Sequence, residues 1–191
     1  MCLRAVIAIF VMSLLSPFSG LCADTLSTDL RNTLQTEKLR HKPYYVEISI
    51  SGRWLKVYEI DGNGERVPVA EYTVGTAVRG LDTYPVGVGK VTAIVYDPWW
   101  YPTPYTRQIF RGRGIELSEK VPPGHPQNYM GAIKISLSHK TWKGAIYRIH
   151  GNNDPKRVGR RVTGGCFVMN NDDGIALARM IKVGTEVNIL P

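Results

Sequence analysis

Two side chains that could together carry out nucleophilic chemistry lie sixteen residues apart in the last quarter of the sequence. His150 ends an apolar stretch and precedes Gly151, whereas Cys166 directly follows Thr163-Gly164-Gly165. A thiol becomes an effective nucleophile when a neighbouring imidazole lowers its pKa or takes its proton. Glycines before a cysteine let backbone N–H groups approach a developing oxyanion closely. The segment is therefore a candidate for acyl transfer, with Cys166 and His150 as the side chains that could carry it.

The N-terminal residues decide which cysteines remain in the mature protein. After Arg4 an uncharged apolar run covers residues 5–15, and small residues with a proline follow up to Ala23. This order is typical of a secretory signal peptide, which we predict to cover residues 1–23. The run is shorter than the roughly 20 apolar residues of a membrane span. An uncleaved anchor is the alternative interpretation.

Cleavage at this point removes two of the three cysteines, Cys2 and Cys22, and leaves Cys166 alone. Exported proteins usually use cysteines in disulfide pairs. A solitary cysteine is therefore a buried inert thiol, an intermolecular bridge or a working nucleophile. The neighbourhood of Cys166 favours the nucleophile.

The net charge of +8 indicates an acidic partner. Such a charge suits nucleic acids, anionic lipid surfaces or a carboxylate-rich cell wall. Export argues against a nucleic acid, and no segment after residue 23 is apolar enough for a membrane span. The remaining histidines, His41, His125 and His139, lack the spacing of metal ligands. We therefore expect no metal and no cofactor.

The hydrophobic pattern predicts one mostly β domain with long loops. Residues 24–41 look like a lead-in with leucines at four-residue spacing, and residues 42–191 form the domain. Alternating apolar residues predict strands at about 44–50, 54–60, 67–74, 90–96, 132–137, 145–149 and 185–190. One short C-terminal helix is predicted from about 172 to 182. The aromatic, proline-containing segment 97–105 and the proline-rich segment 121–129 are predicted to be loops.

Several motifs in the same order resemble those of the YkuD-type L,D-transpeptidase family, in particular its ErfK/YbiS/YcfS/YnhG-like periplasmic members. Ile149-His150-Gly151 and the stretch Thr163 to Met169 resemble the I-H-G and S-x-G-C-I-R-M/L motifs. Upstream, 83–87 resembles a T-P-x-G turn, 98–103 an N-P-x-W-x-P-T segment, and 129–131 an N-P-M-G segment. The resemblance covers residues 44–190.

The resemblance implies a β-sandwich-like catalytic domain in which Cys166 is the nucleophile, His150 the base, and the backbone of Gly165 and Cys166 the oxyanion donor. The other residues that it implies support the loop or bind substrate; they are Thr163, Gly151, Tyr147, Arg148 and Arg161. Its usual substrate is a peptidoglycan stem tetrapeptide, cut after the third residue in the periplasm. The acyl group then passes to an amine of a second stem, to a lysine of an envelope lipoprotein, or to water.

Two positions depart from the family pattern. Gly164 stands where histidine or serine is common, and Val168 replaces the usual arginine after the cysteine. Loss of that guanidinium removes a group that could order the loop or meet a substrate carboxylate. Arg148 or Arg161 could take its place. The alternatives to a transpeptidase are an L,D-carboxypeptidase of the same fold and a catalytically weakened peptidoglycan-binding relative.

Overall fold

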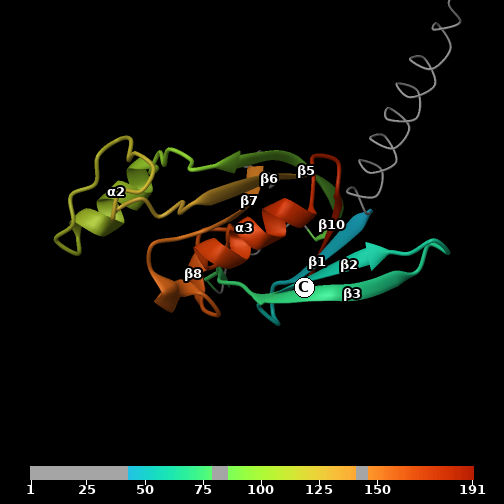
Figure 1. The fold of residues 1–191 in the computed structure, drawn as a ribbon. Helices are drawn as coiled ribbons and strands as arrows, with labels where there is room; N and C mark the ends of the chain where they lie inside the picture. The colour runs from blue at the N-terminus through green and yellow to red at the C-terminus, as the bar shows by residue number, and fades with distance from the viewer. Residues whose placement is uncertain (1–42, 79–85, 141–145) are drawn as a thin grey trace, which may run out of the picture. The chain divides into compact units, whose positions relative to one another are not determined.

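The computed structural model describes residues 43–78, 86–140 and 146–191, and most of its regular structure is β-strand. Within these residues eight strands form one sheet in the order β3-β2-β1-β10-β5-β6-β7-β9. Figure 1 shows that β1–β3 and β5–β7 run in different directions, with helix α3 drawn between them. The predicted signal peptide and the lead-in lie outside the described residues.

Two hairpins build one half of the sheet. Strand β1 (Tyr44–Ser49) pairs antiparallel with β2 (Trp54–Ile60), and β2 pairs antiparallel with β3 (Arg66–Thr73). The turn between β2 and β3 is closed by Asp61, whose Oδ1 accepts two backbone N–H groups at 2.8 and 2.9 Å. Short aspartate side chains favour such turns because they bond to the backbone a few residues ahead.

The other half of the sheet contains the strands that carry the predicted site. Strands β5 (Gly87–Tyr96), β6 (Ile133–Lys140) and β7 (Ile146–His150) are antiparallel neighbours, and β9 (Phe167–Val168) pairs parallel with β7. The C-terminal strand β10 (Glu186–Leu190) pairs with β1 on one side and with β5 on the other. It therefore joins the two halves.

A smaller sheet supports the chain before the predicted nucleophile. Strand β4 (Thr76–Ala77) pairs parallel with β8 (Arg161–Thr163), and a short 3-10 helix, η1 (Pro155–Arg157), precedes β8. Gly75 exchanges two backbone hydrogen bonds with Val168, at 2.7 and 2.9 Å. These bonds hold β9 on the side that β7 does not cover.

The main core lies between the sheet and helix α3 (Asn171–Met180). On β6, Ile133, Ile135 and Leu137 alternate with more exposed residues, so one face of the strand is fully buried. Helix α3 contributes Leu177 and Ala178 to the same core. Its first turn holds two aspartates, whose charges suit the positive end of the helix dipole.

A second, smaller core forms in the connection between β5 and β6. It contains helix α2 (Pro104–Arg111), and Figure 1 shows α2 at one end of the domain, apart from α3. Three aromatic rings meet there, with centroid distances of 6.5 Å for Trp100–Phe110, 5.4 Å for Trp100–Tyr129 and 4.9 Å for Phe110–Tyr129. Tilted and edge-on rings at such distances stabilise a small cluster beyond their buried area.

The mainly β architecture and the C-terminal helix are confirmed, whereas the prediction of only one helix is wrong, because α2 forms at the end of the predicted 97–105 loop and beyond it. Helix α2 begins there because Thr103 accepts the Thr106 N–H at 3.1 Å and Pro104 occupies the first helical position. A threonine cap followed by proline is a helix-start pattern, and the surrounding prolines and aromatics obscured it. No helix in the described residues is long and apolar enough to cross a membrane.

Gly174 in α3 provides a test of this packing. A Cβ at Gly174 would lie 2.5 Å from Cγ2 of Ile133, a stiff β-branched side chain in β6. We expect Gly174→Ala to lower the free energy of unfolding by about 1–3 kcal/mol, although alanine favours helices. Gly62→Ala is the control, because a Cβ there meets no atom within 4 Å. Urea unfolding that finds Gly174→Ala as stable as the parent would contradict the close packing.

Candidate active site

The pairing of β7 with β9 brings the two predicted catalytic residues onto neighbouring strands. The parallel register places Ile149 beside Phe167 and His150 beside Val168. One residue further back, Arg148 lies beside Cys166, which immediately precedes β9. Cys166 therefore lies one strand across and two residues back from His150. Neighbouring strands are about 4.8 Å apart, and each residue along a strand adds about 3.3 Å.

The alternation of side chains along the two strands places the candidate catalytic side chains on one face of the sheet. Tyr147, Ile149 and Phe167 belong to the main core, with 6%, 0% and 0% of their surfaces exposed. Successive side chains in a strand point to opposite faces. His150 and Cys166 therefore project from the face opposite to this core, and Arg148 projects with them.

The turn before Cys166 is held by Thr163. The Thr163 hydroxyl donates to the carbonyl oxygen of Cys166 at 2.7 Å, and its Oγ1 accepts the Gly165 N–H at 3.2 Å. Gly165 has a φ of +143°, and a Cβ there would lie 3.3 Å from the Tyr147 ring. Only glycine suits this combination of backbone conformation and close packing.

The hydrogen bond from the Gly165 N–H to Thr163 affects which backbone groups can act as the predicted oxyanion donors. The Gly165 N–H already has an acceptor, so its donor role would require this bond to be exchanged. The Cys166 N–H has no acceptor among the described residues, and it remains available to a developing oxyanion. Thr163 and Gly165 thus shape the turn that presents Cys166.

A backbone carbonyl determines which ring nitrogen of His150 carries the proton. The Nδ1 atom of His150 lies 2.6 Å from the carbonyl oxygen of Gly151. A carbonyl only accepts hydrogen bonds, so Nδ1 carries the proton and a neutral ring has its lone pair on Nε2. The arrangement is that of a base whose tautomer is set by a third group.

Asn171, which the sequence analysis did not identify, fixes the loop that carries this carbonyl. Its Oδ1 accepts the N–H of Ala132 at 2.9 Å and that of Asn152 at 3.0 Å. A Cβ on Gly151 would lie 2.2 Å from the same oxygen, and a Cβ on Gly131 would lie 2.3 Å from it. Both glycines are therefore required for the loops to close around the Asn171 amide.

Burial keeps the imidazole neutral. It lowers the pKa of His150 from 6.5 to about 4, and the charges of Arg157 and Arg148 also lower it, whereas the bond to Gly151 raises it. His150 is only 7% exposed. At neutral pH the ring can therefore accept a proton through Nε2.

The thiol is also favoured in its neutral form. Burial raises the pKa of Cys166, whereas the positive charge of Arg148, hydrogen bonds from its backbone and its side chain, and the charge of Arg157 oppose that rise. Cys166 is partly exposed, so solvent weakens the effect of burial on this pKa. A neutral thiol beside a neutral imidazole favours general-base catalysis over a preformed ion pair.

Of the residues predicted to bind substrate, two lie at Cys166 and one lies on another strand. Arg148 contacts Cys166, and Tyr147 packs against the turn before it. Arg161 lies on β8, and the arginines whose charges lower the pKa of His150 are Arg157 and Arg148 instead. Val168 is fully buried between β7 and Gly75, which explains why an apolar side chain suits this position.

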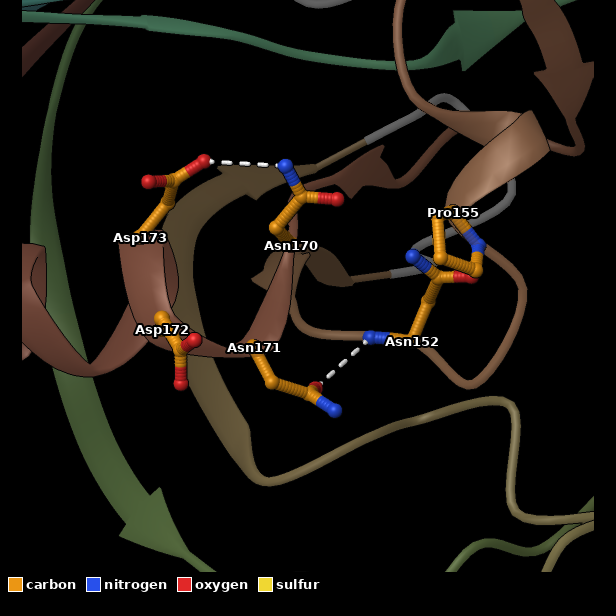
Figure 2. Close-up of a pocket in the computed structure, with 6 residues that line it drawn as sticks. All are labelled: Asn152, Pro155, Asn170, Asn171, Asp172 and Asp173. Atoms are coloured by element: carbon orange, nitrogen blue, oxygen red, sulfur yellow. Dashed lines mark hydrogen bonds between the residues drawn. The ribbon is translucent and has the colours of Figure 1, made fainter.

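A polar pocket lies beside these residues, with a volume of about 440 Å³. Figure 2 shows that its walls come from the loop after β7 and from the start of α3. The lining residues are Asn152, Pro155, Asn170, Asn171, Asp172 and Asp173. It adjoins the loop that holds His150, and neither His150 nor Cys166 lines it. In the described part of the chain no group of three His, Cys, Asp or Glu side chains could hold a metal.

The sequence and fold match those of known proteins. The model of the YkuD family, described as the L,D-transpeptidase catalytic domain, matches residues 43–189. The putative L,D-transpeptidase YkuD of Bacillus licheniformis is 32% identical over 149 residues, which cover 78% of this chain and 67% of the relative. The probable L,D-transpeptidase ErfK/SrfK of Escherichia coli is 33% identical over 145 residues, which cover 76% and 43%.

A solved structure shares the fold. L,D-transpeptidase 3 from Mycobacterium tuberculosis has a TM-score of 0.51 at 13% identity, over 78% of this chain and 62% of that chain. The chain spans about two thirds of the Bacillus relative and less than half of the Escherichia coli relative.

The lowered pKa of His150 predicts how stability depends on pH. Unfolded chains bind a proton at His150 near pH 6.5, whereas the folded protein does so only near pH 4. This contribution to the free energy of unfolding is complete above about pH 6.5 and falls by about 3 kcal/mol as pH decreases towards 4. Urea unfolding at pH 7 and 4.5 should show a smaller loss in His150→Gln than in the parent. Equal losses in both proteins would show that His150 is not buried in its neutral form.

Proposed function

Since this chain belongs to the YkuD family of L,D-transpeptidase catalytic domains, we propose that it is a peptidoglycan-remodelling L,D-transpeptidase with Cys166 as nucleophile and His150 as base. One observation carries the assignment of these residues. Strands β7 and β9 hold both side chains on the same face, and Gly151 leaves the Nε2 atom of His150 free to take a proton.

The reaction proceeds through a thioester. As the sulfur of Cys166 bonds to the scissile carbonyl carbon, Nε2 of His150 takes the thiol proton and the carbonyl oxygen becomes an oxyanion. The Cys166 N–H stabilises this oxyanion. When the intermediate collapses, the carbon–nitrogen bond breaks and the imidazolium gives its proton to the departing amine.

An acceptor amine completes the transfer. It attacks the thioester carbonyl while His150 takes one of its protons, a new amide bond forms, and the carbon–sulfur bond breaks. The sulfur then regains a proton from the imidazolium. Acceptors are an amine of a second stem peptide or a lysine of an envelope lipoprotein.

Hydrolysis is the second candidate for the same site. Cys166 is partly exposed, so water can reach the thioester and release a trimmed peptide instead of a crosslink. The same residues would then make an L,D-carboxypeptidase. A weakened peptidoglycan-binding relative is favoured by the raised pKa of the Cys166 thiol, because a protonated thiol attacks slowly.

Export to the periplasm fits this substrate. Residues 1–23 serve as a signal peptide, residues 24–41 as a lead-in, and residues 42–191 as the catalytic domain. The positive net charge of the chain suits a wall rich in carboxylates.

Mass spectrometry of the protein with a stem tetrapeptide tests the assignment. We expect an acyl adduct on Cys166 and a crosslinked product, with a trimmed tripeptide in its place if water is the acceptor. Cys166→Ala should lose at least about 1,000-fold in turnover, because Cys166 is the only cysteine after residue 23 that could form the thioester. Its thermal unfolding should match the parent, which would show that the fold is kept.

Each of the other readings has its own outcome in this experiment. Turnover by Cys166→Ala at the parent rate would exclude the thiol mechanism. Binding of the peptide by the folded parent without an adduct or product would identify a peptidoglycan-binding relative.

A further inference from the structure

Arg157 carries a partly buried positive charge beside an aromatic ring. Its guanidinium carbon lies 5.2 Å from the centre of the Tyr129 ring, and burial lowers the pKa of Arg157. Asp154 attracts it, but among the described residues no carboxylate forms an ion pair with Arg157 within 4.0 Å. The Asp154 carboxylate instead accepts the N–H of Lys156 at 3.1 Å.

Two other arginines, Arg148 and Arg113, add positive charge near Arg157. Arg148 contacts Cys166, and its charge and that of Arg157 act on both Cys166 and His150. Arg113, which lies over the Phe110 ring at 5.9 Å, repels Arg157. No ion pair in the described residues involves Arg148 or Arg113 either.

Such an arrangement is costly without an anionic ligand. A guanidinium removed from water loses hydration, and the face of an aromatic ring returns only part of that loss. Guanidinium groups bind carboxylates especially well, because their planar donors match the two carboxylate oxygens. The site therefore has the charge and the donors for one carboxylate beside the thiol.

We propose that Arg157, with Arg148, binds the free C-terminal carboxylate of the donor peptide, which belongs to the residue that leaves. This inference rests on the proposed function and identifies how that site selects its substrate. The carboxylate of the leaving residue lies one residue, about 3.5 Å along the chain, from the scissile carbonyl carbon. A peptide held at Cys166 thus brings this carboxylate among the arginines.

The consequence is a preference for cleavage one residue from a free C-terminus. A tetrapeptide presents its carboxylate to the arginines, whereas a C-terminal amide or a longer peptide presents a neutral group. A charge-assisted hydrogen bond to a carboxylate contributes enough to make this preference about tenfold or more in kcat/KM.

The test compares a stem tetrapeptide that ends in a free carboxylate with the same peptide as its C-terminal amide. Using the full chain, we expect the parent to favour the acid about tenfold or more in kcat/KM. Arg157→Gln should lose most of this preference, because the KM for the acid rises while the KM for the amide has no carboxylate contact to lose. Arg160→Gln is the matched control, because Arg160 is exposed and three residues away.

A binding measurement separates this inference from the proposed chemistry. Calorimetry with Cys166→Ala should show tighter binding of the acid than of the amide, and the added change Arg157→Gln should remove the difference. Equal binding of acid and amide, or no binding of either, would overturn the inference whatever the turnover results are. Equal losses for both peptides in Arg157→Gln would also overturn it, and thermal unfolding checks that each variant is folded.

Discussion

The parallel pairing of β7 with β9 is the constraint on which the site depends. One register places Arg148 beside Cys166 and leaves His150 one pleat further along, and a shift by one residue would turn Cys166 into the core. The core residues on the opposite face resist such a shift, since Ile149 and Phe167 are fully buried. Gly75 fixes β9 from its other side through two backbone hydrogen bonds. The same strand pairing therefore determines both the packing of the core and the positions of Cys166, His150 and Arg148.

A second constraint is the set of hydrogen bonds that connects α3 with the loop beside His150. The Asn171 amide accepts two backbone N–H groups from loops that follow Gly131 and Gly151. The second of these loops supplies the carbonyl oxygen that holds His150 Nδ1. Because α3 packs on the core through Leu177 and Ala178, the orientation of the imidazole is tied to the main body of the domain. The His150 ring is thus oriented by the Gly151 carbonyl oxygen and, through the loop, by the Asn171 amide.

Sequence patterns predicted the parts of this design that are local. The longer strands were predicted from their alternation and α3 from its apolar side, whereas the two- and three-residue strands β4, β8 and β9 were missed. The roles of Cys166 and His150 stay a prediction from glycine-rich motifs. Helix α2 was missed, since its Thr103 cap lies among prolines and aromatic residues. The roles of Asn171 and Arg157 depend on contacts between segments far apart in sequence, with Ala132 and Tyr129 respectively. No periodicity or spacing reports such contacts.

The charges around the site link substrate binding to proton transfer. The arginines favour the thiolate of Cys166, yet they disfavour the imidazolium that the proposed proton transfer to His150 would form. In the free protein burial favours the neutral form of both groups, and the arginines reinforce this at His150 and oppose it at Cys166. A carboxylate bound at Arg157 would cancel part of the positive charge acting on His150 and raise its pKa. The same carboxylate would also raise the pKa of the Cys166 thiol, so it helps proton transfer only as far as its charge lies nearer to the imidazole than to the sulfur.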